Sequence, residues 1–159
     1  MIAMGLRENI LEETVAKLPL REVIKVRPTT PVRDVAKKMR EKHLGCAILV
    51  DAKGKPVGKF TERKLMRLLL ENPKNLDEPV VKFSYPSGDP VAMTDSIAQM
   101  VQVMQAKQLR FLSVVDGQGR VVALTGQKGL MEYIAEHFPR RVKVERLHSK
   151  LSMDDREGA

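Results

Sequence analysis

The chain contains an internal repeat, and this feature constrains its fold more than any other. When the 159-residue sequence is aligned with itself at an offset of 65 residues, residues 39–66 pair with residues 104–131 without a gap. Nine of the 28 pairs are identical: Met39/Met104, Lys42/Lys107, Leu44/Leu109, Val50/Val115, Asp51/Asp116, Gly54/Gly119, Val57/Val122, Leu65/Leu130 and Met66/Met131. Similarity at a fixed offset is the signature of a duplicated structural unit. We therefore expect two copies of one unit.

Each copy has the apolar pattern of a helix, a β-hairpin and a second helix. Apolar residues within 32–39 and 97–104 recur at i, i+3, i+4 and i+7, which indicates one buried face on each helix. A short apolar run ending in Asp-x-x-Gly follows, which is typical of a strand closed by a tight turn. A second strand and a helix come next, and a Pro-containing extended lead-in precedes each copy. The expected strands are 46–50, 56–60, 111–115 and 121–125, the later helices are 62–71 and 127–137, and the lead-ins are 26–31 and 90–94.

The core of these units must be built from aliphatic residues and methionine. Hydrophobic residues make up 43% of the chain, which excludes a disordered protein, but only 4% of residues are aromatic and none is Trp. The length suits one domain, or two very small ones sharing a core, and we expect the two halves to pack about one pseudo-twofold core. Five methionines at helical core spacing are predicted to fill it: Met39, Met66, Met100, Met104 and Met131.

The cysteine content and the N-terminal sequence indicate the cellular compartment of the protein. Cys46 is the single cysteine, which excludes a disulfide framework and a multi-cysteine zinc site and indicates a reducing compartment. Its position in an apolar run predicts core packing rather than nucleophilic chemistry. The N-terminus is charged where a signal peptide would be apolar, and no apolar stretch is long enough to span a bilayer. We therefore expect a cytoplasmic protein with no membrane partner.

Three segments of the first copy carry a family resemblance. Residues 26–39, 48–54 and 58–65 together resemble a CBS (cystathionine-β-synthase) domain, and residues 91–134 resemble a second, diverged one. The resemblance implies a CBS pair, or Bateman module. Such a module has an α/β (α+β) fold in which two β-α-β-β-α repeats pack about a pseudo-twofold axis and leave two clefts. In this family the modules are regulatory, bind adenosine-type ligands and usually dimerise through their helices.

The resemblance, which covers roughly residues 22–138, divides the chain into five segments. They are an N-terminal helical extension (1–21), the first repeat (22–72), a linker (73–79), the second repeat (80–138) and a basic then acidic tail (139–159). In the extension, Leu6, Ile10, Leu11 and Val15 lie on one side of a possible helix over 6–18, which we expect to pack on the module or across a dimer. Pro139 is expected to end the last helix. A strand, a helix and a disordered segment all remain open for the tail.

The ligand motif of the family is only partly present. That motif, Gly-x-x-Thr/Ser-x-x-Asp, joins the last strand of a repeat to its last helix, where free N–H groups hold a phosphate and the carboxylate accepts from the ribose diol. The first copy matches at Gly58 and Thr61 but has Lys64 in place of the Asp. Lysine has no acceptor and cannot replace that carboxylate. Lys59, Arg63 and Lys64 would suit a phosphate-rich ligand held without ribose contacts, or they are solvated surface charges.

The second copy departs further from this motif. The ungapped alignment places Ala123, Gly126 and Gly129 at the three motif positions. A shift of one residue recovers Thr125 but then places Lys128 at the position of the Asp. Both alignments lack the carboxylate. The candidate ligand-binding residues of the two copies are Gly58, Lys59, Thr61, Arg63, Lys64, Thr125, Gly126 and Lys128.

The resemblance implies a regulatory module that senses a small anionic ligand of the adenine-nucleotide type in a cleft between the repeats. AMP, ADP, ATP or another phosphate-containing metabolite are the candidate ligands, and no cofactor is required. The module is expected to act through a homodimer formed by its helices, or on an unknown regulated protein. An enzyme is not expected, because the sequence has no catalytic constellation or phosphate-loop motif and His43, His137 and His148 lack metal-ligand spacing.

Two other classes of protein stay open. One is a dimeric interaction scaffold whose clefts bind nothing. The other is a nucleic-acid-binding protein, because the net charge is +8, the isoelectric point is near 9.7, and basic residues concentrate in 33–67 and 140–150. Against nucleic-acid binding, no aromatic residues alternate with the basic ones as stacking platforms, and no helix-turn-helix or zinc motif is present.

Overall fold

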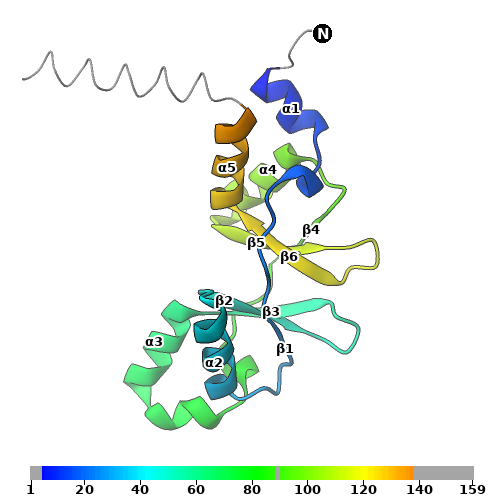
Figure 1. Cartoon of the computed structure of the whole chain (residues 1–159). Coiled ribbons are helices and arrows are strands. Elements are labelled where there is room, and N and C mark those ends of the chain that lie inside the picture. Colours follow the sequence, from blue (N-terminus) through cyan, green and yellow to red (C-terminus); the bar gives the residue numbers. More distant parts are fainter. Residues whose placement is uncertain (1–4, 89, 138–159) are drawn as a thin grey trace, which may run out of the picture.

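The structure, a computed structural model, describes residues 5–88 and 90–137 as two halves with the same order of elements (Figure 1). The first half contains β1 (Lys25–Val26), α2 (Val32–Lys42), β2 (Cys46–Val50), β3 (Pro56–Thr61) and α3 (Glu62–Glu71). The second contains β4 (Val91–Ala92), α4 (Ile97–Lys107), β5 (Phe111–Val115), β6 (Val121–Gly126) and α5 (Gln127–His137). Helix α1 (Leu6–Glu12) and the 3-10 turn η1 (Val15–Lys17) precede them, and η2 (Pro73–Asp77) and η3 (Val80–Phe83) connect them. The expected α/β order is confirmed in both halves.

Each half forms a three-stranded sheet, with strand orders β1-β2-β3 and β4-β5-β6. The first two strands of each sheet are parallel and the last two are antiparallel. Cys46 lies opposite Thr61 in the first sheet, and Phe111 lies opposite Gly126 in the second. Both pairs are related by the offset of 65, so the ungapped alignment is correct. The shifted alignment, in which Thr125 would take the place of Thr61, is wrong.

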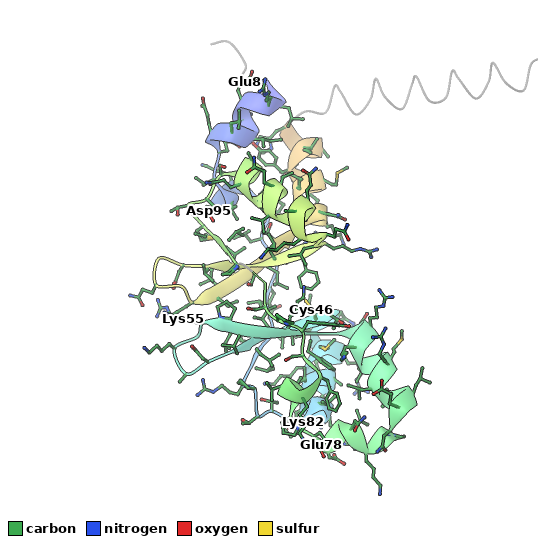
Figure 2. All side chains as sticks on the ribbon, turned by 180° about the vertical axis from the view of Figure 1, so that it is seen from behind. Glu8, Cys46, Lys55, Glu78, Lys82 and Asp95 are labelled. Atoms are coloured by element: carbon green, nitrogen blue, oxygen red, sulfur yellow. The ribbon has the colours of Figure 1, made fainter. Side chains whose placement is uncertain are left out.

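The interior consists of three apolar clusters rather than the one core expected from the sequence. One lies between the first sheet and its helices and includes Phe60 and Leu68, and another lies in the second half and includes Met100 and Tyr133. The third joins the two sheets face to face and contains Cys46, Ile48, Val50, Val115, Val121 and Leu124. Figure 1 shows the sheets facing each other with the helices on their outer sides, and Figure 2 shows Cys46 at the boundary between the halves.

The two hairpin turns share the same backbone hydrogen bonds to an aspartate. The Asp51 carboxylate accepts hydrogen bonds from the N–H groups of Lys53 (2.8 Å) and Lys55 (3.0 Å). Asp116 accepts equivalent bonds from Gln118 (2.9 Å) and Arg120 (3.0 Å). The glycines that end the turns, Gly54 and Gly119, have φ of 81° and 79°, which side chains disfavour. The Asp-x-x-Gly prediction is therefore confirmed in both copies.

The N-terminal segment differs from its prediction. The helix ends at Glu12, and Leu11, expected on a packing face, is 57% exposed. Val15 lies beyond the helix and is fully buried in the core of the second half. Its N–H donates to Asp95 O (2.8 Å), and the N–H of Ala16 donates to Met93 O (3.1 Å). The single helix over 6–18 is wrong because backbone pairing with the second half replaces further helical turns.

Two of the five predicted core methionines lie on the surface. Met39, Met100 and Met104 are buried, whereas Met66 is 63% exposed and Met131 is 64% exposed. The residues two positions further along each helix, Leu68 and Tyr133, are the ones that face the core. The predicted tail, with Pro139, the basic block 140–150 and His148, lies outside the described residues.

Candidate functional site

The two places where a sheet passes into its last helix are related by the repeat, and each is flanked by a segment from elsewhere in the chain. We call the first junction the residues from Gly58 to Lys64, and the second junction residues 123–129. Lys59 exchanges backbone hydrogen bonds with Tyr85 (2.9 and 2.8 Å). Leu124, the repeat counterpart of Lys59, exchanges them with Arg21 (2.8 and 3.0 Å). Tyr85 therefore borders the first junction and Arg21 borders the second.

At the first junction, the side chains of Thr61, Lys64 and Lys59 each make a contact within the protein. The Thr61 hydroxyl accepts from the Lys64 N–H at 3.3 Å, so Thr61 is the N-cap of α3. The Lys64 ammonium lies 5.2 Å from the centre of the Tyr85 ring, and the Lys59 ammonium lies 5.3 Å from that of Phe111. Both distances suit cation–π contacts.

The other two candidate residues of the first junction, Gly58 and Arg63, have different surroundings. A methyl group on Gly58 would lie 3.1 Å from Ser84 Oγ and 3.2 Å from Tyr85 O, so a side chain there would crowd the segment that enters the second repeat. Arg63 lies on the exposed side of α3. Thr61 and Lys64 are thus in contact, and Gly58 and Lys64 both lie against Tyr85. The Lys59 side chain contacts Phe111 of the second repeat instead, and Arg63 faces outward.

The second junction borders a cavity of about 400 Å³ between the two repeats. Its lining is mostly apolar with cationic side chains. The first repeat contributes His43, Leu44, Gly45 and Cys46, and the remaining lining residues are Arg21, Arg110, Phe111, Leu124, Thr125, Gly126, Lys128 and Gly129. A cavity of this size, with an apolar wall and a few polar groups, has the character of a small-molecule site.

Glycines at the second junction allow close backbone contact. A Cβ on Gly126 would lie 2.3 Å from Arg110 O, and one on Gly129 would lie 3.1 Å from Pro19 O. The N–H of Gln127, which begins α5, donates to the same Arg110 oxygen at 3.1 Å. The glycines at these two motif positions therefore have a packing role.

Thr125 and Lys128 have opposite surroundings. Thr125 is 2% exposed, and its hydroxyl donates to Met100 Sδ at 3.7 Å. It is the repeat counterpart of the buried Phe60, so its side chain points to the core and only its backbone is available to the cavity. Lys128 is exposed on the first turn of α5 and lines the cavity, as does Gly126.

Nine of the twelve lining residues were not among the sequence candidates, including Arg110, Arg21 and Phe111. Arg110 is the repeat counterpart of Gly45, so comparing the two copies for charge differences would have found it. Arg21 precedes the repeated segment and reaches the cavity only through its pairing with Leu124. Arg21 also forms an ion pair with Glu132 of α5, in which both side chains are about 40% exposed. Phe111 lies opposite Gly126 at the start of β5.

Burial disfavours nucleophilic chemistry at the thiol in the cavity wall. Burial raises the pKa of Cys46 to about 11, so the thiolate is scarce at neutral pH. Core packing, as predicted for Cys46, is confirmed. Among residues 5–88 and 90–137, no three His, Cys, Asp or Glu side chains are grouped so as to hold a metal ion. None of the described helices is long and apolar enough to cross a membrane.

Part of the basic block at 33–67 is paired locally. Arg33 contacts Asp77 at 3.2 Å, and Lys42 contacts Glu22 at 2.7 Å. The hydrogen bond that the Lys42 ammonium donates to the Glu22 carboxylate raises the pKa of Lys42. Together with the ring contacts of Lys59 and Lys64, these pairs give four cations of the block partners within the protein.

Comparisons with known proteins agree on one family. Residues 15–71 match the sequence model of the CBS domain. A protein of Methanopyrus kandleri is 28% identical over 122 residues, which cover 75% of this chain and 61% of that protein. A protein of Methanocaldococcus jannaschii is 25% identical over 150 residues, 86% of this chain and 35% of that protein.

A solved structure extends the likeness to both repeats. A CBS domain protein of Pyrobaculum aerophilum, complexed with AMP, has a TM-score of 0.67 at 22% identity, and the match covers 84% of this chain and 97% of that one. This chain spans less than two thirds of the two sequence relatives named above, so the likeness concerns this module and not the whole of those proteins. Residues 15–71 therefore match the CBS-domain family by sequence, and the two repeats together have the fold of a tandem CBS pair.

Proposed function

We propose that this chain is a regulatory module that senses a small phosphate-bearing ligand of the adenine-nucleotide type in the cavity at the second junction. The observation that carries the proposal is the cavity itself, about 400 Å³ with an apolar wall and cations at its edge. Phe111, Leu124 and Cys46 offer apolar surface to a flat base. Arg21, Arg110 and Lys128 offer donors to a phosphate, for which guanidinium groups are well suited. The AMP bound to the P. aerophilum protein supports this ligand class.

Binding at this cavity would connect the two repeats. Residues 43–46 belong to the first repeat, and residues 124–129 belong to the second. A ligand that contacts both stabilises the arrangement of the sheets in which the cavity is formed, and it shifts the population of conformers by its differential affinity. A regulatory module transmits such a shift in the population of conformers to its target, and this requires no chemical reaction.

The binding test uses isothermal titration calorimetry of the full chain with AMP, ADP and ATP. We expect at least one to bind, and Lys128→Gln to weaken that binding about fivefold, the equivalent of about 1 kcal/mol. Arg63→Gln is the matched control, because Arg63 is the repeat counterpart of Lys128 and lies outside the cavity. If none of the three nucleotides gives heat or raises the melting temperature, the proposal fails and the ligand-free scaffold becomes the better interpretation.

We also propose that the module acts as a homodimer through its helices. The supporting observation is the apolar surface of α3, where Met66 is 63%, Leu69 37% and Leu70 89% exposed. The corresponding helices of the second half leave a groove of about 470 Å³ between α4 and α5, with Val101 and Leu130 in its wall. Apolar side chains exposed together are typical of interaction surfaces.

Charge favours one arrangement of such a dimer. Helices α2 and α3 carry eight Lys or Arg and four Asp or Glu, whereas α4 and α5 carry two of each. Pairing α2 and α3 of one copy with α4 and α5 of the other avoids the contact of two basic surfaces. Light scattering during size-exclusion chromatography is expected to give a dimer that Leu70→Lys dissociates, whereas Val122→Lys, at a 45% exposed residue of β6, leaves it intact. A monomeric native chain would contradict this proposal.

A further inference from the structure

We infer that the two hairpin turns form a basic surface that binds the phosphate backbone of a nucleic-acid duplex without reading its sequence. The turns are residues 51–55, between β2 and β3, and residues 116–120, between β5 and β6. The inference goes beyond the proposed function, because this surface shares no residue with the cavity at the second junction.

The two turns lie side by side on one side of the molecule. The N–H of Val121 donates to Gly54 O at 2.9 Å, which joins the second hairpin to the first. A Cβ on Gly54 would lie 3.5 Å from Arg120 Cγ, and one on Gly119 would lie near the other turn as well, 3.6 Å from Lys55 Cε. Figure 1 shows both hairpins projecting in the same direction. The turns therefore form one continuous surface.

Five cationic side chains gather on this surface. Three belong to the turns, and two come from the segment that leads into the first repeat. Of these two, Arg27 Nη1 donates to Asp51 O at 2.7 Å, and Lys25 Nζ donates to Val121 O at 3.4 Å. All five cationic residues are exposed: Lys25, Arg27, Lys53, Lys55 and Arg120.

Two carboxylates lie among these cations and offset part of their charge. Asp51 accepts from the N–H groups of its own turn, and Asp116 pairs with Arg120 Nε at 2.9 Å. Within residues 5–88 and 90–137, the other four cations have no carboxylate within ion-pair distance. The surface therefore keeps a net positive charge, which favours a polyanionic partner.

The composition of the turns favours a phosphate backbone over an acidic protein. Interfaces between proteins are usually centred on large apolar or aromatic side chains. The turns contain no apolar side chain larger than that of Ala52, and the exposed valines of the hairpins, Val57 and Val122, lie beyond the turns on β3 and β6. The turns also contain no aromatic ring on which an unpaired base could stack. Contacts to the phosphates of a duplex need neither kind of side chain.

The test is fluorescence anisotropy of a short labelled DNA duplex, titrated with the full chain at several salt concentrations. We expect duplexes of unrelated sequence to bind with equal affinity. The double substitution Lys53→Gln/Lys55→Gln should make the slope of log affinity against log salt concentration shallower by about two, because each phosphate contact contributes about 0.9. Lys37→Gln/Lys38→Gln removes the same charge from exposed positions of α2 and is the matched control, for which the native slope is expected.

Three results would overturn the inference. They are an absence of duplex binding, a salt dependence that Lys53→Gln/Lys55→Gln leaves unchanged, and equally tight binding of polyglutamate of matched charge, which would assign the surface to an acidic protein. Calorimetry with AMP, run on the same variants, reports on the cavity separately. We expect the native AMP affinity in both variants, so a failure of the inference leaves the proposed function standing.

Discussion

The first and second junctions have the same backbone pairing but place a glycine on opposite strands. In the first, Gly45 O accepts from the N–H of Glu62, and the side chain at the corner is that of Thr61 on β3. In the second, Arg110 O accepts from the N–H of Gln127, and the glycine is Gly126 on β6. At this corner Thr61 corresponds to Gly126, and Gly45 corresponds to Arg110. The exchange of glycines removes the capping hydroxyl of the first junction and adds an arginine to the second.

The segments that border the junctions increase this difference. At the first junction, Tyr85 provides a ring that the Lys64 ammonium covers. At the second, Arg21 holds the equivalent place and lines a cavity. Neither Tyr85 nor Arg21 belongs to the gapless repeat. Two copies of one fold can therefore differ in ligand capacity through residues that the duplication did not supply.

The largest expected effect comes from filling the corner of the second junction. In Gly126→Ala, the new Cβ would lie 2.3 Å from Arg110 O and 2.8 Å from the Cα of Phe111, both of which are backbone atoms. We expect a loss of about 3 kcal/mol in the free energy of unfolding, measured by urea denaturation. Gly117→Ala is the control, because nothing lies within 4 Å of its Cβ and its repeat counterpart is Ala52. Equal stability of the two variants would contradict the exchange of side chains described above.

Much of this fold was predictable because it is set by local patterns. Strands 46–50 and 111–115 and helices 62–71 and 127–137 have the bounds expected from their apolar runs and the turns between them. The residues paired in the hairpin of the first half and those paired in the second also differ by 65, because the turns fix the register of the strands. Local apolar periodicity and turn chemistry are sufficient for this level of description.

The rest depended on contacts between distant residues. Helix α3 has more apolar residues than one stripe can hold, so periodicity alone did not show that Leu68 is buried and Met66 exposed. The end of α1 is decided by backbone bonds to the segment 93–96. Tyr85 and Arg21 reach the junctions through strand pairing across the chain, for which the sequence carries no local signal.

The difference between the two junctions is tested most directly by restoring the family carboxylate at the first junction. Lys64→Asp removes the cation that covers the Tyr85 ring and adds an acceptor to the first turn of α3, where a negative charge is favourable. We expect calorimetry to show two AMP molecules per chain instead of one, with the new site preferring AMP over 2′-deoxy-AMP about tenfold, or about 1.4 kcal/mol. Lys64→Gln, which removes the charge without adding a carboxylate, is the control. If the stoichiometry stays at one AMP per chain, residues other than Lys64 prevent AMP from binding at the first junction.

A smaller difference separates the cores of the two halves. Tyr133 is the repeat counterpart of Leu68, and both are buried, but the Tyr133 hydroxyl donates to the Glu13 carboxylate. Burial, assisted by Glu13, raises the pKa of Tyr133 from 10.0 to about 12. Because the folded protein favours the neutral phenol, its stabilising effect is complete below pH 10 and is lost as the pH rises toward 12.

Tyr133→Phe is therefore expected to lower the free energy of unfolding by about 1 kcal/mol at pH 7. The variant should also lose less stability than the native chain between pH 10 and 12, as followed by denaturation at each pH. Tyr85→Phe, at a partly exposed tyrosine, is the control. Identical pH profiles for Tyr133→Phe and the native chain would contradict a buried phenol bonded to Glu13.

The smallest effects are expected where the two halves are most alike, at the hairpin turns. Backbone hydrogen bonds from Lys55 and from Arg120 lower the pKa values of Asp51 and Asp116 below 3.8. Each carboxylate therefore stabilises the fold above pH 4, and this contribution is lost as the pH falls below that value. Asp51→Asn and Asp116→Asn keep an acceptor but lose the charge, so both should lower the melting temperature slightly at pH 7 and not at pH 2. Asp116→Asn should have the larger effect, because Arg120 Nε also donates to Asp116 at 2.9 Å. A large effect in one turn alone would mean that the turns, like the junctions, have diverged.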